Sequence, residues 1–313
     1  MDGIDRGVTP ADRQQLDRVS LSFLADRLDV RRGGVAANIA LGLGRLGLRP
    51  VLVGAAGVDF PEYDAWLSEH GVDTSSVRVS ETLHTARFVC TTDVEQNQIA
   101  TFYAGAMAEA GRIDLRAVHR HAQPLDLVIV GADDPEAMLR HTATAHALGI
   151  PLAADPSQQL ARLDTEQTRR LVDGAHLLFT NEYEAALLLD RTGWSHDEVL
   201  AKVGTWVITR GADGVSIAAT GTEQRDIPAV PTNDVVDPTG VGDAFRAGFL
   251  AGIAWQLPYQ RAAQLGCALA TVVIESVGTQ EYKLLPSDLL ARINKAYGQQ
   301  PAEDIASRLA TAP

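Results

Sequence analysis

The chain has 313 residues, of which 46% are hydrophobic and 21% charged, a balance typical of globular proteins with a hydrophobic core. Its 27 basic and 40 acidic residues give a net charge of −13, which argues against nucleic acid as a partner. Two cysteines without paired spacing argue against a disulfide framework or a structural zinc site, and no apolar run has membrane-spanning length, so we expect a soluble, cytoplasmic protein without a membrane partner.

The first part of the chain predicts a small sheet and a helix. Residues 19–30 and 85–103 alternate apolar and polar side chains, as half-exposed antiparallel strands do. Between them, residues 35–47 predict a helix that ends in GLGRLG. This fits the dinucleotide-binding pattern G-x-G-x-x-G by letter, but that pattern must follow a strand and open a helix. We therefore interpret the glycines as helix-packing residues, with Gly47 as the C-terminal cap.

From residue 125 onward, short apolar strands alternate with helical patterns. The expected strands are 125–132, 150–155, 175–181 and 205–211, the expected helices are 135–148 and 166–172, and residues 214–230 read as a hairpin. Strands of this kind, joined by helices, predict an α/β fold with a mainly parallel sheet covered on both faces. Ligands of such sheets bind at the carboxyl ends of the strands. Polar residues that directly follow strands, among them Asp155 to Gln159, Asn181 and Thr209, are therefore candidate site residues.

The stretch DPTGVGDAFRAGF, from Asp237 to Phe249, combines a glycine-rich turn with a helix start. Successive amides of Gly240, Val241 and Gly242 would point outward at a helix N-terminus, where the dipole favours an anion. Asp243 has two interpretations. It is either a first-turn acid that stabilises the helix by ~0.5 kcal/mol, or a base beside an anion cradle, which is the arrangement that phosphoryl transfer requires together with a metal.

Four motifs resemble the ribokinase-type (PfkB-like) carbohydrate and nucleoside kinases, in the order of that family. They are GGVAANIA at 33–40, TNEYE at 180–184, VITRGADG at 207–214 and DPTGVGDAF at 237–245. The stretches RRGGVAANIA, HTARFVCTTD, GADDPEAMLRHT and AADPSQQLARL extend the similarity toward actinobacterial adenosine kinases. The resemblance implies one ribokinase-like domain over residues 1–313, with a small β-sheet lid formed by about 18–30 and 84–104.

The resemblance implies roles for the residues around the glycine-rich turn. Asp243 would be the base that activates the sugar 5′-hydroxyl, and Gly240, Val241 and Gly242 would form the anion hole for the γ-phosphate. The positions that match ATP contacts are Asn181, Thr209, Gly211 and Gly214. Glu184 completes an N-x-x-E pair that organises magnesium-bound water, and Asp237 lies where related kinases hold a monovalent cation such as K⁺. Arg210 departs from the apolar residue of many relatives.

The same resemblance implies acceptor contacts. The matching positions are Ser22, Gly34, Asn38, Phe88, Phe102, Gln158, Gln159 and Arg162. Phe88 and Phe102 would sandwich the adenine, because a flat base stacks well on aromatic rings. By themselves, the residues favour strand packing beneath the lid for the two phenylalanines and a solvent-facing place for Ser22.

One departure from the family concerns the first 18 residues. Relatives open with a core strand whose terminal aspartate binds the ribose hydroxyls, whereas a polar run precedes residue 19 here. Either translation starts upstream or the chain lacks this strand and its substrate ligand. We expect a longer, active gene product, because a missing central strand would leave buried backbone groups unpaired.

The leading interpretation is an ATP-dependent kinase of purine salvage that uses Mg²⁺ and converts adenosine to AMP. The first alternative keeps the fold and changes the acceptor to ribose or another sugar. The second is a nucleoside-binding protein without catalysis. The oligomeric state is left open by the sequence: related lids often pair across a homodimer, and the alternation in residues 85–103 leaves a face able to do so.

Overall fold

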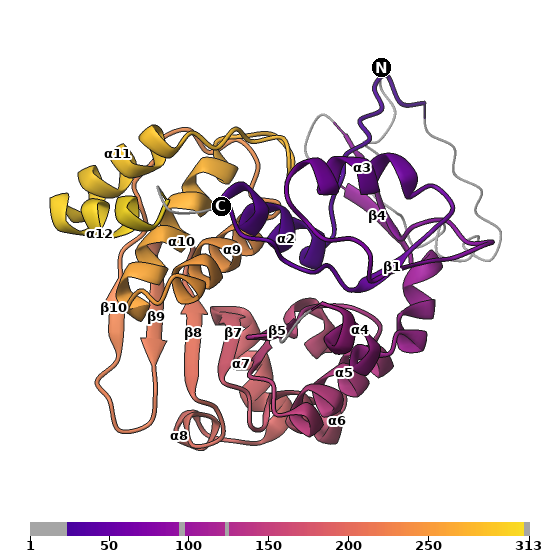
Figure 1. The fold of residues 1–313 in the computed structure, drawn as a ribbon, viewed down its shortest axis with the longest axis horizontal. Coiled ribbons are helices and arrows are strands. Elements are labelled where there is room, and N and C mark those ends of the chain that lie inside the picture. The colour runs from indigo at the N-terminus through magenta and orange to yellow at the C-terminus, as the bar shows by residue number, and fades with distance from the viewer. Residues whose placement is uncertain (1–23, 94–97, 123–124, 310–313) are drawn as a thin grey trace, which may run out of the picture. The chain divides into compact units, whose positions relative to one another are not determined.

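A computed structural model describes residues 24–93, 98–122 and 125–309. Contacts within the chain divide it into two parts, residues 31–89 with 101–313 and residues 1–30 with 90–100. The larger part is built around a six-stranded sheet with helices on both faces, which confirms the predicted α/β fold class (Figure 1).

The six strands lie in the order β10-β9-β8-β7-β6-β5. Their bounds are Val128–Val130 (β5), Leu152–Ala154 (β6), Leu177–Asn181 (β7), Thr205–Thr209 (β8), Val215–Ala218 (β9) and Arg225–Ile227 (β10). The first four are parallel, and β9 and β10 are antiparallel additions at one edge. Because both faces are covered, β7 is buried at four successive positions.

One face of the sheet is covered by the helices that link the parallel strands. They are α5 (Pro135–Leu148), α6 (Thr165–Val172), α7 (Glu182–Thr192) and α8 (His196–Leu200). Each begins at a polar residue whose side chain accepts a hydrogen bond from the first turn, namely Asp134, Asp164, Asn181 and Ser195. Such caps satisfy amides that have no partner within the helix. Leu178 and Trp206 of the sheet are buried in the cluster on this face.

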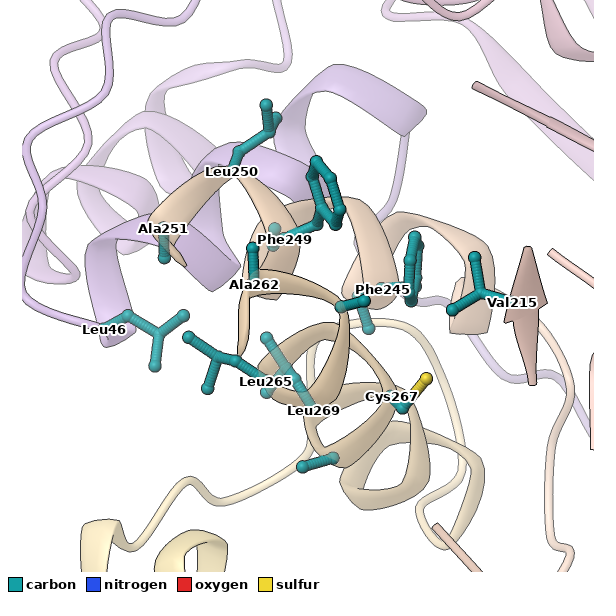
Figure 2. Packing of buried hydrophobic residues seen from close by; sticks show 14 of the residues in the cluster. Leu46, Val215, Phe245, Phe249, Leu250, Ala251, Ala262, Leu265, Cys267 and Leu269 are labelled. Carbon is teal, nitrogen blue, oxygen red and sulfur yellow. The ribbon is translucent and has the colours of Figure 1, made fainter. Parts of the chain in front are cut away.

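The opposite face carries α2 (Val35–Arg45), α9 (Val241–Ala254) and α10 (Tyr259–Ile274), followed by α11 (Pro286–Tyr297) and α12 (Gln299–Leu309). Phe179 of β7 meets Phe249 of α9 edge to face, with ring centroids 5.5 Å apart. A Cβ on Gly248 would lie 2.7 Å from the Cα of Gly266, so α9 and α10 pack almost backbone to backbone (Figure 2). This packing fixes α9, the helix that carries Asp243. No helix in the described ranges is long and apolar enough to cross a membrane.

The C-terminal end of α2 explains the GLGRLG stretch. Gly47 has φ +85° and follows the last helical turn. The Leu48 amide donates to the Leu43 carbonyl at 3.0 Å, and the Gly47 amide donates to Gly44 at 2.9 Å, the bond pattern of a glycine-ended helix. The interpretation of Gly47 as a cap rather than part of a dinucleotide fingerprint is confirmed.

Smaller elements surround this body. Strands β1 (Gly54–Ala56) and β2 (Val77–Val79) form a parallel pair, and α3 (Pro61–Glu69) lies between them in the chain. A short 3₁₀ helix, η2 (Gly105–Arg112), and α4 (Leu115–His121) precede the large sheet.

The segment 85–103 contains two paired strands, β3 (Arg87–Thr92) and β4 (Gln98–Tyr103), as the alternation predicts. The strand expected over residues 19–30 is absent from residues 24–30, the described part of that segment. Leu24 and Leu28 are 91% and 85% exposed there. Alternation produces a strand only where a neighbouring strand supplies hydrogen bonds. Residues 1–18, which bear on the expected loss of a core strand, lie outside the described ranges, and the lid assignment stays a prediction.

Candidate active site

The glycine-rich turn forms the start of α9. Gly240 is its N-cap, with φ +76°, and a Cβ at this position would lie 2.8 Å from the side chain of Thr279. Only glycine therefore fits here without strain. Val241, Gly242 and Asp243 form the first helical turn, where the amides have no acceptor within the helix. The residues of the predicted anion cradle thus lie at a helix N-terminus, and their role in binding an anion stays a prediction.

Asp243 points toward α2 in this turn. Asn38 Nδ2 donates to Asp243 Oδ2 at 2.7 Å, which joins two predicted site residues that are 205 positions apart. Burial raises the pKa of Asp243 to about 6, against the opposing effects of Asn38 and Arg246 and with further increase from Asp155 and Glu184. A carboxyl group with this pKa is ionised at neutral pH and close enough to it to accept a proton efficiently.

A buried ion pair lies directly behind Asp243. Arg246, one helical turn further along α9, contacts Asp155 through two nitrogens, each 2.6 Å from a carboxylate oxygen. Its third nitrogen, Nη1, donates to the Gly242 carbonyl at 3.0 Å. Although burial disfavours its charge, Asp155 raises the pKa of Arg246, so the guanidinium stays cationic. The pair joins the cradle to the end of β6.

Sequence reasoning missed Arg246 as a functional residue. A signal was present, because the arginine interrupts the apolar run AFRAGF and Asp155 was already a candidate that follows a strand. A charge in the apolar stripe of a buried helix needs a partner.

Asn181 and Glu184 form a capping box at the start of α7. Asn181 Oδ1 accepts from the Glu184 amide at 2.7 Å, and Glu184 Oε2 accepts from the Asn181 amide at 2.8 Å. Glu184 Oε1 accepts a longer hydrogen bond of 3.3 Å from Ser157. The N-x-x-E pair therefore has a structural role in addition to the predicted one, and it leaves Oε1 of Glu184 the less engaged oxygen.

Three residues predicted to contact ATP, Thr209, Gly211 and Gly214, lie at or just after the end of β8, and the structure restricts their substitution to different degrees. Thr209 ends β8 and donates weakly to the Thr180 carbonyl at 3.4 Å. Gly211 begins the short η4 (Gly211–Asp213), is exposed and has open space around its Cα. Gly214 has φ +92°, and a Cβ there would lie 2.1 Å from the Ile227 carbonyl oxygen. Gly214 is thus required by the close approach of the chain after β10 to the start of β9, whether or not ATP contacts Gly214.

Asp237 organises the loop before α9. Its two carboxylate oxygens accept from the amides of Thr239 and Gly278, both at 2.9 Å. Burial alone would raise the pKa of Asp237, but these hydrogen bonds outweigh it and lower the pKa. An anionic carboxylate at this place is compatible with a nearby cation. In the described part of the chain, no three His, Cys, Asp or Glu side chains form a ready-made metal cluster.

The predicted acceptor residues are placed unevenly. Gly34 caps α2 and is exposed, one turn before Asn38. Phe88 and Phe102 are 68% and 54% exposed, so neither packs into a core as the strand-packing alternative predicts. On the short η3 (Ser157–Ala161) and directly after it, Gln158 and Arg162 are exposed. Gln159 is buried, and its Oε1 has no partner among the described residues. Ser22 lies outside the described ranges.

Comparison with known proteins gives a consistent result. The family described as pfkB family carbohydrate kinase matches residues 7–286. A nucleoside kinase of Methanocaldococcus jannaschii is 28% identical over 250 residues, which are 79% of this chain and 80% of that protein. A ribokinase of Bacillus subtilis is 28% identical over 255 residues, 79% of this chain and 83% of that one.

A solved structure extends the comparison to the fold. The nucleoside kinase of Burkholderia thailandensis in complex with inosine superposes with a TM-score of 0.83 at 35% identity, covering 90% of this chain and 93% of that one. The same enzyme has also been solved with ADP and inosine. These similarities confirm the predicted fold and the kind of chemistry, whereas the particular closeness to actinobacterial adenosine kinases stays a prediction.

Proposed function

This chain belongs to the pfkB family of carbohydrate kinases, and from that membership we propose that it transfers the γ-phosphate of ATP to the 5′-hydroxyl of adenosine, giving AMP and ADP. As a member it is an ATP-dependent kinase of nucleosides or sugars, and so a phosphotransferase with an alcohol as acceptor. The observation that carries the proposal is Asp243, held by Asn38 in the first turn of a helix whose N-cap is Gly240.

The chemistry assigned to the site is a direct transfer. Asp243 accepts the proton of the acceptor hydroxyl while that oxygen bonds to the γ-phosphorus and the bond to the β,γ-bridging oxygen breaks. The amides of Gly240, Val241 and Gly242 stabilise the negative charge on the transferring group. Asp243 then carries the proton, and ADP leaves with the bridging oxygen.

Two cations belong to the proposal. Mg²⁺ would neutralise charge on the β- and γ-phosphates, and Glu184 Oε1 is the oxygen available to a water bound to it. A monovalent cation such as K⁺ would lie near Asp237, whose carboxylate is ionised and oriented by the Thr239 and Gly278 amides. Removal of Mg²⁺ with a chelator should abolish turnover, and replacement of K⁺ by a bulky organic cation should reduce it.

The acceptor is proposed to be a nucleoside because of the exposed aromatic rings of Phe88 and Phe102. A flat purine base stacks on an exposed aromatic ring, a contact worth about 1 to 3 kcal/mol per base. The similar enzyme of Burkholderia thailandensis binds inosine. A sugar acceptor is the second candidate, because a ribokinase is among the relatives.

A binding protein without catalysis fits the site less well. Asn38 donates to Asp243, which favours the ionised carboxylate, and burial keeps its pKa at about 6. A binder has no use for a buried, ionised carboxylate in the first turn of the helix whose N-terminus would hold the anion, because such a group weakens anion binding.

The test is ADP release by the purified protein with ATP and Mg²⁺, comparing adenosine, inosine and ribose as acceptors. Adenosine should give the largest kcat/KM, and Asp243→Asn should lower it by about 10² to 10⁴, the usual contribution of a general base. If Asp243→Asn turned over as fast as the wild-type protein, Asp243 would not be the base. ADP release with ribose, and not with either nucleoside, would mean that the acceptor is a sugar.

The aromatic contact has its own test in Phe102→Ala. We expect kcat/KM for adenosine to fall by about 5- to 150-fold, the loss of one stacking contact worth about 1 to 3 kcal/mol, while any turnover of ribose stays unchanged. Leu285→Ala is the matched control, since Leu285 is an equally exposed apolar side chain (54%) outside the predicted site. An equal loss with both acceptors would show that Phe102 supports the fold of its strand instead.

A further inference from the structure

Asn38 is one link in a chain of side-chain hydrogen bonds that ends at Asp243. Its Nδ2 donates to Asp243 Oδ2 at 2.7 Å, and its Oδ1 accepts from Gln280 Nε2 at 2.8 Å. The two ends of an amide have the same shape, and a rotation by 180° exchanges donor and acceptor. The surroundings must therefore select the orientation in which Asn38 donates to the carboxylate.

Gln280 provides this selection, and Trp66 of α3 determines how Gln280 itself is oriented. The indole Nε1–H of Trp66, which can only donate, lies 3.2 Å from Gln280 Oε1. Tyr63 donates its hydroxyl proton to the Gly33 carbonyl at 2.9 Å and accepts the second N–H of Gln280. Gln280 is 1% exposed, so water cannot take over these bonds. It can offer Asn38 only an N–H.

The neighbouring Thr279 is a weaker alternative. Its hydroxyl lies 3.0 Å from Asn38 Oδ1 and 3.1 Å from the Arg32 carbonyl, and its single proton serves one acceptor at a time. Gln280 has a separate N–H for each of its two acceptors. Among the described residues, Gln280 is therefore the partner that donates to Asn38 without sharing that proton with another acceptor.

We propose that Gln280 is a positioning residue for phosphoryl transfer: held by the Trp66 indole, it keeps the Asn38 amide turned so that Asn38 donates a hydrogen bond to Asp243. An Asn38 amide turned the other way would place its oxygen against the carboxylate. That contact repels the ionised form and favours the protonated one, which cannot accept a proton. The inference rests on the proposed function, in which Asp243 is the base.

Charged groups on every element around Asp243 act on the same carboxyl group. The charges that act on Asp243 are Arg246 on α9, Asp155 after β6 and Glu184 on α7. Three further charged residues, Arg32, Arg45 and Glu281, lie near Gln280 and its partners. A neutral substitution at Gln280 changes none of these charges. A shift in the titration of Asp243 would then report the orientation of Asn38.

The decisive measurement is the titration of the Asp243 carboxyl carbon by ¹³C NMR, with the signal assigned by its loss in Asp243→Asn. It needs no turnover, so it stands even if adenosine is not the acceptor. Gln280→Met, close in shape and unable to donate, should raise the pKa of Asp243 by about one unit, the typical effect of losing a hydrogen bond to a charged group. Gln264→Met is the matched control, because Gln264 is equally buried but bonds to Arg261.

A double variant tests whether Trp66 acts through Gln280. Trp66→Phe keeps an aromatic ring beside Arg32 and Arg45 and removes the N–H, so it should raise the pKa by a smaller step. In the Gln280→Met background it should add nothing, because both changes break one chain of bonds. Trp66→Phe also serves alone if Gln280→Met does not fold.

In the active enzyme, the acid limb of the pH profile of kcat should move by the same amount, with the KM for ATP unchanged. An unshifted Asp243 in both variants, or a shift as large in Gln264→Met, would overturn the inference. A shifted Asp243 in an enzyme that does not turn over adenosine would support the inference and refute the proposed acceptor.

Discussion

At the scale of single residues, Asp243 shows how a carboxylate is kept ionised against its surroundings. Burial favours its neutral form, and among the described residues Asn38 and Arg246 counteract this by hydrogen bonding and charge. Asp155 and Glu184 add negative charge nearby. The site therefore holds a carboxylate that the fold itself does not favour, a common cost of catalytic groups.

The first prediction concerns stability. The folded pKa of about 6 exceeds the unfolded value of 3.8, so the folded protein binds more protons between these values and loses stability as pH rises through that window. At pH 7 the charge costs roughly 3 kcal/mol. Asp243→Asn should therefore raise Tm at pH 7.5 and have little effect at pH 4, as measured by calorimetry.

Asp197→Asn provides the control for this experiment. It also changes a first-turn acid, here in α8, but its side chain is fully exposed. Its Tm should not rise at either pH. A lower Tm for Asp243→Asn at pH 7.5 would mean that the carboxylate contributes to stability, contrary to the burial argument.

The second prediction is the pH dependence of the wild-type enzyme. Since only the ionised form of Asp243 accepts a proton, kcat/KM should fall tenfold per pH unit below about pH 6. The measurement is a pH profile with saturating Mg²⁺ and limiting adenosine. A flat profile down to pH 5 would exclude Asp243 as the group that limits the rate.

At the scale of elements, the start of α7 combines capping with a candidate role at magnesium. The third prediction separates these roles. Glu184→Gln keeps an oxygen that can accept from the Asn181 amide, so stability should change little, while Mg²⁺-dependent turnover should fall at least tenfold. Asn181→Ala removes the cap and should cost about 1 kcal/mol in urea unfolding. Full activity of Glu184→Gln would leave the carboxylate with its structural role only.

The fourth prediction concerns the connection between α9 and β6. Arg246→Met leaves Asp155 buried without its partner and should destabilise the protein by about 3 to 5 kcal/mol, measured by denaturant unfolding. Arg246→Met with Asp155→Asn should recover part of this loss, because no buried charge then remains. A loss below about 1 kcal/mol for the single variant would mean that solvent reaches the pair.

At the scale of the whole molecule, the exposed strands β3 and β4 predict self-association. Val89 is 54% exposed and follows Phe88 along β3, so the two side chains point to opposite faces. One face could thus meet a base while the other pairs with a second copy. Sedimentation should give a dimer of the 33.4 kDa chain, and Val89→Asp should give a monomer that still binds adenosine. A monomeric wild-type protein would refute the dimer.

Sequence reasoning recovered the features that are local in the chain. The strand and helix alternation after residue 125 and the cradle at Gly240 to Asp243 were predictable because periodicity and turn chemistry act over a few residues. The contacts among the residues that surround Asp243 were not predictable from such local patterns. Arg246 and Asp155 are 91 positions apart, and Gln280 and Asn38 are 242 apart. Only the folded chain brings such pairs together.

The burial of Arg246 and Asp155 has a consequence for how the protein responds to ionic strength. Mobile ions screen charges that they can approach, over about 8 Å at physiological salt. The Arg246 and Asp155 side chains are only 7% and 1% exposed, so dissolved ions cannot come between them. At constant K⁺ concentration, added salt should weaken the attraction of a polyanionic co-substrate to the N-terminus of α9, yet leave the attachment of α9 to the sheet intact. As the salt concentration rises, the enzyme should therefore lose affinity for the polyanionic co-substrate at a lower concentration than the one at which it unfolds.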